Sequence, residues 1–296
     1  MWICLRFVME FKFNFFDPQD LVTKTEETED NYHSPTEANT QRLEQFQELF
    51  PDKFDHHQYS KFRQNNYNFS KVNINCYRSE DIEKWIVIKN SEASVVKTAA
   101  ESHSDLVPNV YEGGLTIWEC GCDLAEFITD GNIDFKQKSV LELGCGAGLP
   151  GICAMKLGAD QVHFQDYNSE VISHFTIPNV LELNNRPSCQ CRFFSGDWEE
   201  FQKHSTITYD YILTAETIYN SENYPKLHKL LQHLLKDDGR ILVAAKSNYY
   251  GVGGGTGLFE DFVQKEGYFS YTCVKTIEAG VPREIVMLEK SQGEQL

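Results

Sequence analysis

Apolar and polar positions form a regular pattern from about residue 123 onward. Five short runs are almost continuously apolar and predict buried strands: KSVLELG (138–144), QVHFQD (161–166), CRFFSGDW (191–198), YDYILTAE (209–216) and RILVAAK (240–246). Other runs have apolar residues three and four positions apart and predict helices: CDLAEFIT, PGICAMKLG (150–158), SEVISHFTIPNVLELN (169–184), YPKLHKLLQHLL (224–235) and LFEDFVQKEG. Gly158 is a plausible C-cap, and Pro178 should break the helix that contains it. Strands that alternate with helices indicate a parallel sheet.

The chain closes with two strands, YTCVKTIEAG and REIVMLEK, which have no helix between them. Such a pair must form an antiparallel hairpin, because a parallel pair needs a long crossover. The predicted fold is therefore an α/β, Rossmann-like sheet of five parallel strands and a terminal antiparallel hairpin.

The first third of the chain is less regular. Residues 17–48 are acidic and polar, and their composition predicts disorder. Residues 49–80 mix aromatic with polar residues and give no clear pattern. EKWIVIKN (83–90) is predicted to be a strand that could pair with ASVVKTA (93–99). We therefore divide the chain into a largely disordered extension, 1–80, and a catalytic domain, 81–296.

Composition narrows the functional classes. The net charge of −17 argues against sequence-independent nucleic-acid binding, which needs a cationic face, and is compatible with a basic protein partner. Nine cysteines without a secretory leader favour a reducing compartment, cytosol or nucleus. The two C-x-C pairs lack the spacing typical of zinc sites, so no metal is expected. No apolar run is long enough to span a membrane.

The first glycine-rich loop, LELGCGAGLPG (141–151), lies between a predicted strand and a helix, where nucleotide cofactors bind. Leu149 stands where a dinucleotide fingerprint has its third glycine. Glu142 precedes Gly144 and Gly146, and a carboxylate there suits a ligand with cationic groups such as S-adenosylmethionine. A pyrophosphate would be repelled.

The next strand ends are also acidic. Asp166 ends the second strand, where an acid accepts the two hydroxyls of an adenosine ribose. The third strand ends in Gly196, Asp197 and Trp198, where the acid could bind the adenine amino group and the indole could cover the ring. If the upstream segment 102–120 folds over the strand ends, Trp118 and Glu119 would line the same site.

These blocks resemble the histidine protein methyltransferases, most closely the eukaryotic branch. The resemblance rests on SHSDLVPNVYEGGLTIWEC, LELGCGAGLPG, HFQDYN, CRFFSGDW, ILTAETIYN and YYGVGGGTGLF and covers roughly residues 84–290. It implies a seven-stranded, S-adenosylmethionine-dependent enzyme that methylates the tele (τ) nitrogen of a histidine in a large-subunit ribosomal protein and releases S-adenosylhomocysteine. MEFKFNF from Met9 is similar to the usual family start, so residues 1–8 are expected to be an extension.

The resemblance also implies cofactor contacts. They fall on Ile117, Trp118, Glu119, Cys120, Gly121, Gly144, Gly146, Gln165, Asp166, Tyr167, Gly196, Asp197, Trp198 and Ala215. The family's usual aspartate before the glycines is Glu142 here, which keeps the charge but changes the reach. We expect a monomer in the cytoplasm and nucleus, including the nucleolus.

Methyl transfer to a histidine does not require a general base before attack. Imidazole has an unperturbed pKa of about 6.5, so most of it is neutral and nucleophilic at neutral pH. The enzyme must instead control the tautomer, and Glu216 in AETIYN (215–220) could accept the hydrogen bond of the other ring nitrogen. Tyr219 and Asn220 could shape the pocket. Glu216 could also simply cap the next turn.

Three other functions stay open. A lysine methyltransferase of the same fold would need to deprotonate its target. A non-catalytic binder of a ribosomal protein would keep the fold without the activity. An NAD-dependent dehydrogenase is disfavoured by Glu142, Leu149 and the terminal hairpin.

A second glycine-rich run, YYGVGGGTG (249–257), follows the fifth strand at the same edge of the sheet. No acid with adenosine-binding spacing precedes it. We interpret it as a loop on the substrate side, flanked by Tyr249 and Tyr250, and a flexible connector is the alternative.

Overall fold

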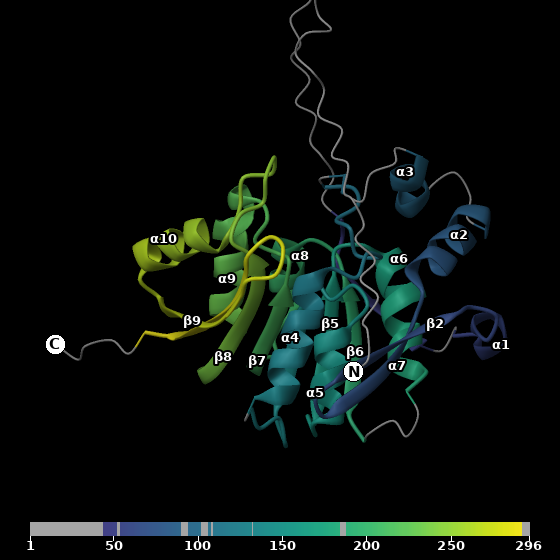
Figure 1. Ribbon diagram of the computed structural model, residues 1–296, viewed down its shortest axis with the longest axis horizontal. Helices are drawn as coiled ribbons and strands as arrows, with labels where there is room; N and C mark the ends of the chain where they lie inside the picture. Colours follow the sequence, from purple (N-terminus) through teal and green to yellow (C-terminus); the bar gives the residue numbers. More distant parts are fainter. Residues whose placement is uncertain are drawn as a thin grey trace, which may run out of the picture. The chain divides into compact units, whose positions relative to one another are not determined.

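The structure is a computed structural model that describes residues 44–51, 54–89, 94–101, 106–107, 109–131, 133–183 and 188–291. An eight-stranded sheet has the order β1-β6-β5-β4-β7-β8-β10-β9 (Figure 1). Its five parallel strands are β4 (Ser139–Leu143), β5 (Gln161–Asp166), β6 (Gln190–Ser195), β7 (Tyr209–Ala215) and β8 (Leu235–Lys246). The hairpin of β9 (Phe269–Ile277) and β10 (Arg283–Lys290) joins β8 in antiparallel fashion. The predicted α/β class and terminal hairpin are confirmed.

The strands bury both faces because helices cover the two sides of the sheet. Alternate residues of one strand enter different cores: Val140 lies in one cluster, and Leu141 and Leu143 lie in the other. This is the two-residue period of extended chain. The first core contains α4 (Glu119–Asp130), α5 (Leu149–Lys156) and α7 (Ile177–Leu181). The second contains α8 (Trp198–His204), α9 (Tyr224–Leu234) and α10 (Thr256–Glu266).

The segment predicted to break at Pro178 stays helical. It runs from α6 (Ser169–Val171) through a π-helical turn, Ile172–Thr176, into α7. Pro178 lies in the first turn of α7, where its missing N–H costs little. The wider π turn accommodates the proline. The helix therefore changes its pitch before Pro178 and does not break as predicted.

The predicted strands at 83–90 and 93–99 are wrong. The structure has helices there, α2 (Ser79–Lys89) and α3 (Val95–Glu101). Ile82 and Ile86 are fully buried, whereas Ile88 is 84% exposed. A strand would place Ile86 and Ile88 on one face, so the burial follows the helical period. The run of β-branched residues in EKWIVIKN suggested a strand, but the tertiary packing decided the outcome.

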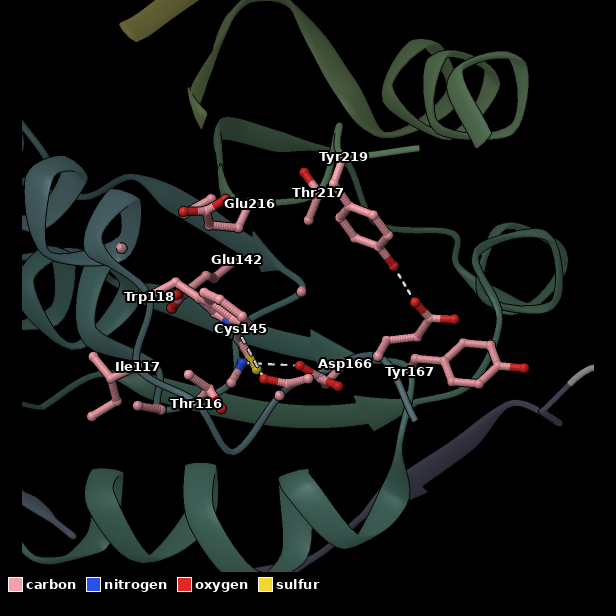
Figure 2. A pocket seen from close by; sticks show the side chains of 18 of the residues that line it. Thr116, Ile117, Trp118, Glu142, Cys145, Asp166, Tyr167, Glu216, Thr217 and Tyr219 are labelled. Atoms are coloured by element: carbon pink, nitrogen blue, oxygen red, sulfur yellow. Dashed lines mark hydrogen bonds between the residues drawn. The ribbon is translucent and has the colours of Figure 1, made fainter. Parts of the chain in front are cut away.

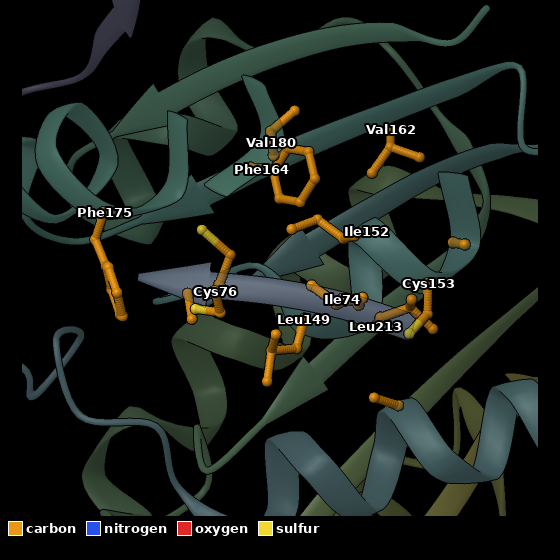
Figure 3. Packing of buried hydrophobic residues seen from close by; sticks show 14 of the residues in the cluster. Ile74, Cys76, Leu149, Ile152, Cys153, Val162, Phe164, Phe175, Val180 and Leu213 are labelled. Carbon is orange, nitrogen blue, oxygen red and sulfur yellow. The ribbon is translucent and has the colours of Figure 1, made fainter. Parts of the chain in front are cut away.

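Residues 44–80 also differ from the predicted extension. β1 (Gln47–Leu49) pairs with β6 along the edge of the sheet, so the sheet has one strand more than expected. Beyond it lie a short helix, α1 (His56–Tyr59), and a hairpin of β2 (Gln64–Phe69) and β3 (Val72–Tyr77). Ile74 and Cys76 of β3 pack against Leu149 and Ile152 of α5 (Figure 3).

The predicted boundary at residue 80 is therefore not a boundary of the fold, because residues 41–296 form one compact unit. The predicted disorder of 17–48 is wrong for residues 44–48, and the rest of that segment lies outside the described residues. Within the described part of the chain, none of the helices has the length and apolar character needed to cross a bilayer.

Candidate active site

A pocket opens at the carboxyl ends of β4, β5, β6 and β7, and the first glycine-rich loop forms its floor. Gly146 has a left-handed backbone with φ +48°, and a Cβ there would lie 2.8 Å from the carbonyl oxygen of Gly114. Only glycine allows this approach. The loop after β4 therefore packs directly on the YEGG segment, which comes from before α4.

Two buried carboxyl groups lie beneath this loop. Asp166 is 4% exposed and accepts a 2.9 Å hydrogen bond from the Gly146 N–H. Glu142 is 3% exposed and accepts one of 2.8 Å from the Gly151 N–H in α5. Burial raises the pKa of Asp166 to about 6 and raises the pKa of Glu142 well above its usual value. Two acids that are difficult to ionise alone are suited to a ligand that brings positive charge or hydroxyl donors.

The end of β6 supplies a third wall. Asp197 caps α8 through the Glu199 N–H and forms a 2.8 Å ion pair with Lys226 of α9. Trp198 donates its indole N–H to Gln165 at 3.2 Å. Asp197, Trp198 and Lys226 line the pocket, so the predicted acid is present but already has a cationic partner.

The upstream segment lies over the strand ends, as its composition suggested. Asn168 ties it to the loop after β5 by donating to the Val110 carbonyl at 2.8 Å and accepting from the Glu112 N–H at 3.2 Å. Tyr219 donates its hydroxyl to Glu112 from the opposite wall (Figure 2). Loops after β5 and β7 therefore hold a single cover over the pocket.

Glu216 follows β7 and occupies an unusual backbone conformation, with φ +57°. Its side chain is 9% exposed, and Oε2 accepts a hydrogen bond from the hydroxyl of Tyr249. Oε1 is buried and has no hydrogen-bond partner among the described residues, although Lys246 Nζ lies 3.6 Å away. A left-handed non-glycine residue is costly and is a recognised feature of functional sites. Glu216 also lines the pocket, so its wall carries a carboxylate oxygen that is ion-paired with Lys246 but accepts no hydrogen bond among the described residues.

Most of the predicted residues meet in this pocket. Those that line it are Ile117, Trp118, Gly121, Glu142, Gly144, Gly146, Asp166, Tyr167, Asp197, Trp198, Ala215, Glu216 and Tyr219. The structure does not place Glu119, Cys120, Gln165, Gly196 and Asn220 on the lining. Gln165 supports Trp198, and Gly196 packs against the backbone of Gln45. Asn220 caps the short helix Ser221–Asn223 by accepting from the Glu222 N–H.

Sequence reasoning missed several residues that line the pocket. They are Asn109, Glu112, Gly113, Gly114, Thr116, Cys145, Ala147, Leu149, Pro150, Thr217, Asn223 and Lys226. The segment 102–120 was recognised as a candidate cover, but only its last residues were assigned to the site. Lys226 lies within an amphipathic helix and carries no local signal that distinguishes it from a surface lysine.

The glycine-rich run 249–257 lies against the turn that follows β7. A Cβ on Gly254 would lie 2.3 Å from the Ile218 carbonyl oxygen, so this glycine is required for close packing. The interpretation as a loop beside the substrate side is consistent with this placement. A flexible connector would not explain such tight packing.

Comparison with known proteins agrees with this geometry. A family model described as lysine methyltransferase matches residues 108–251. The chain is 45% identical over 217 residues to the histidine protein methyltransferase 1 homolog of Rattus norvegicus, which covers 64% of this chain and 60% of that protein. It is 34% identical over 234 residues to histidine protein methyltransferase 1 of Schizosaccharomyces pombe, covering 63% of this chain and 68% of that protein.

Among solved structures, a Streptococcus mutans protein described as a candidate SAM-dependent methyltransferase has a TM-score of 0.51. It is 13% identical and covers 76% of this chain and 55% of that chain. At this identity the likeness shows the fold alone. The chain spans 60% of the rat relative's length.

Proposed function

Because this chain belongs to the histidine protein methyltransferase family, we propose that it transfers a methyl group to a ring nitrogen of a histidine in another protein. S-adenosylmethionine is the cofactor. The acidic side chains of the pocket suit this cofactor. Glu142 and Asp166 are buried acids with raised pKa values, and the cofactor carries two cationic groups and a ribose.

The observation that carries the proposal is Glu216 Oε1, a buried carboxylate oxygen that has no hydrogen-bond partner among the described residues. When bound, the cofactor supplies an already activated methyl group, so the protein mainly has to align and desolvate the nucleophile. A neutral imidazole attacks through one nitrogen and carries a proton on the other. Glu216 Oε1 can accept that proton's hydrogen bond, which fixes the tautomer. Its carboxylate would also stabilise the positive charge that methylation places on the ring, until the proton on the other ring nitrogen is lost to the carboxylate or to water.

The remaining residues of the pocket position the substrate ring and take no part in bond formation. Tyr219 donates to Glu112 and so connects the cover of the pocket to the turn that carries Glu216. The ring therefore enters between this turn and the cover. We propose attack by the tele nitrogen, because it is remote from the peptide backbone and reaches deepest into a closed pocket.

We further propose that the substrate is a basic large-subunit ribosomal protein, met in the cytoplasm and nucleus by a monomeric enzyme. The net charge of −17 supports a cationic partner. No direct contact with nucleic acid is needed for this, and none is proposed.

Lysine is the second candidate target, since the matching family model is described as lysine methyltransferase. The two targets differ in their pH dependence. Imidazole is neutral above about pH 7, so histidine methylation should reach a plateau there. An amine has a pKa of about 10.4, so lysine methylation should keep rising in alkaline buffer.

The deciding experiment incubates the protein with labelled S-adenosylmethionine and purified ribosomal proteins and then maps the label by mass spectrometry. We expect tele-methylhistidine in one large-subunit protein. Label on lysine would contradict the histidine assignment, and no label at all would contradict the proposed activity. The pH profile of the same reaction provides an independent check.

A further inference from the structure

The carboxylate of Glu216 is held by groups from a different part of the chain, the loop after β8. Tyr249 donates its hydroxyl to Oε2. Lys246, the last residue of β8, lies 3.6 Å from Oε1 and also 3.5 Å from Glu119 of α4. The Cys120 thiol of α4 completes the charged and titratable surroundings of Glu216. Oε1 is ion-paired with Lys246 but accepts no hydrogen bond among the described residues, so it can still accept one from a further donor.

The backbone of Glu216 would not hold this position unaided. A left-handed conformation is unfavourable for a residue with a Cβ, because the Cβ comes too close to the following carbonyl oxygen. One restraint is the 2.9 Å hydrogen bond from the Glu216 N–H to the Ala244 carbonyl in β8. The second is the side-chain bond to Tyr249. Without the second restraint, the carboxylate could rotate and present either oxygen to the pocket.

The glycine-rich run is what brings Tyr249 there. The Tyr249 N–H donates to the Gly254 carbonyl at 3.0 Å, which closes the loop on itself. Gly254 packs on the backbone of Ile218 and Tyr219, two and three residues beyond Glu216. Gly255 packs equally closely on Ser247, where a Cβ would lie 2.3 Å from its carbonyl oxygen. The loop and the turn after β7 are therefore a single packed unit.

The Tyr249 hydroxyl also keeps its proton and so remains a hydrogen-bond donor. Burial, followed by the charge of Glu216, raises the pKa of its hydroxyl above the ordinary value, so the proton stays on the oxygen. Its ring lies against Tyr219 with centroids 6.3 Å apart and beneath the Lys246 ammonium, 5.8 Å away. The neighbouring Tyr250 is 74% exposed and has no comparable surroundings.

We propose that Tyr249 is a positioning residue, which fixes Glu216 through Oε2 so that Oε1 faces the incoming substrate ring and selects the nitrogen that is methylated. This inference rests on the proposed function for the identity of the substrate. Tyr249 does not line the pocket, so it acts on the reaction through Glu216. Its hydroxyl also accepts a 3.2 Å hydrogen bond from the Lys246 N–H, which holds it beside the carboxylate.

The test is a double-mutant cycle with Tyr249→Phe and Glu216→Gln, which keep the ring and the side-chain shape respectively. The control is Tyr250→Phe in the same loop. Measurements are kcat, KM for the substrate, Kd for S-adenosylhomocysteine and the ratio of tele to pros methylhistidine. A misplaced catalytic group typically costs on the order of tenfold to a hundredfold in rate.

We expect Tyr249→Phe to lower kcat on the order of tenfold or more and to raise the fraction of pros product, with Kd for the cofactor product unchanged within about twofold. In the Glu216→Gln background the same substitution should have almost no further effect, because the group through which it acts is already lost. Tyr250→Phe should behave as wild type.

Full turnover and an unchanged tele to pros ratio in Tyr249→Phe would overturn the inference. So would losses that multiply in the double variant, since independent effects add in free energy. A lysine product would refute the proposed target and with it the selection of a ring nitrogen. The kcat arm of the cycle would still decide whether Tyr249 acts through Glu216.

Discussion

The buried acid Asp166 makes a specific prediction about cofactor affinity. Its pKa of about 6 in the free protein comes mainly from burial, and ribose hydroxyls donate best to the ionised form. Binding therefore lowers the pKa of Asp166 and releases a proton. By linkage, affinity must rise as the pH rises through 6. We expect the Kd of S-adenosylhomocysteine to increase about tenfold between pH 7.5 and pH 5, as measured by calorimetry.

Asp166→Asn is the matched variant. It should bind more weakly at pH 7.5 and show a smaller pH slope, with the remaining slope due to Glu142, whose pKa is also raised. Melting temperatures at both pH values check that the protein stays folded. An identical slope in wild type and variant would assign the proton to another group.

At the scale of residues, the sequence was sufficient to predict the site residues that lie near the ends of the parallel strands. Glu142, Asp166, Asp197 and Glu216 each lie at or just beyond a strand terminus, so the parallel sheet alone brings them together. Tyr249 was placed only as a flank of a glycine run, because its bond to Glu216 depends on how that loop folds back. Lys226 and Glu112 depend in the same way on packing between distant segments.

At the scale of elements, β1 shows how an edge strand supports the cofactor site. Phe46, just before β1, stacks on Phe194 and Phe201 with centroids 5.9 and 6.2 Å apart. The Asp197 N–H donates to the Glu44 carbonyl at 2.9 Å. The segment that carries β1 therefore holds the turn from β6 into α8, which lines the pocket.

We expect Phe46→Ala to lower the free energy of unfolding by about 2 kcal/mol, because a half-buried aromatic ring is lost from the core. Cofactor affinity should also fall several-fold, since the turn at Asp197 loses its support. Urea unfolding and calorimetry measure the two effects. Phe50→Ala is the control: that side chain is 62% exposed, so its loss should change stability by no more than about 0.5 kcal/mol. Equal effects of both substitutions would contradict this role for the β1 segment.

The elements that the sequence misassigned share a physical cause. β1 has only three residues, and two of them, Gln47 and Glu48, are polar, so no periodicity marks it. α2 contains β-branched and aromatic residues that favour strands, yet only Ile82 and Ile86 are fully buried, and they lie four residues apart. The central strands were predictable because both of their faces are buried, which produces a continuous apolar run.

At the scale of the whole molecule, charge should govern the encounter with the substrate. The chain carries a net charge of −17, and five acids but only one lysine line the pocket. Such a field attracts a basic protein over distances comparable to the Debye length, about 10 Å at 0.1 M salt and about 3 Å at 1 M. Under the proposed function the cofactor binds inside the pocket, where buried contacts are screened much less.

Raising the salt concentration from 0.05 to 0.5 M should therefore lower kcat/KM for a basic ribosomal protein by about tenfold or more, chiefly through KM. kcat and the Kd of S-adenosylhomocysteine should change by less than about twofold, because chemistry and cofactor binding take place out of reach of the screening ions. A short histidine peptide of zero net charge is the matched control and should show almost no dependence on salt. If the protein and the neutral peptide respond alike, or if the loss appears in kcat, then the acidic character of the chain does not recruit the substrate, and recognition must come from uncharged contacts near the pocket.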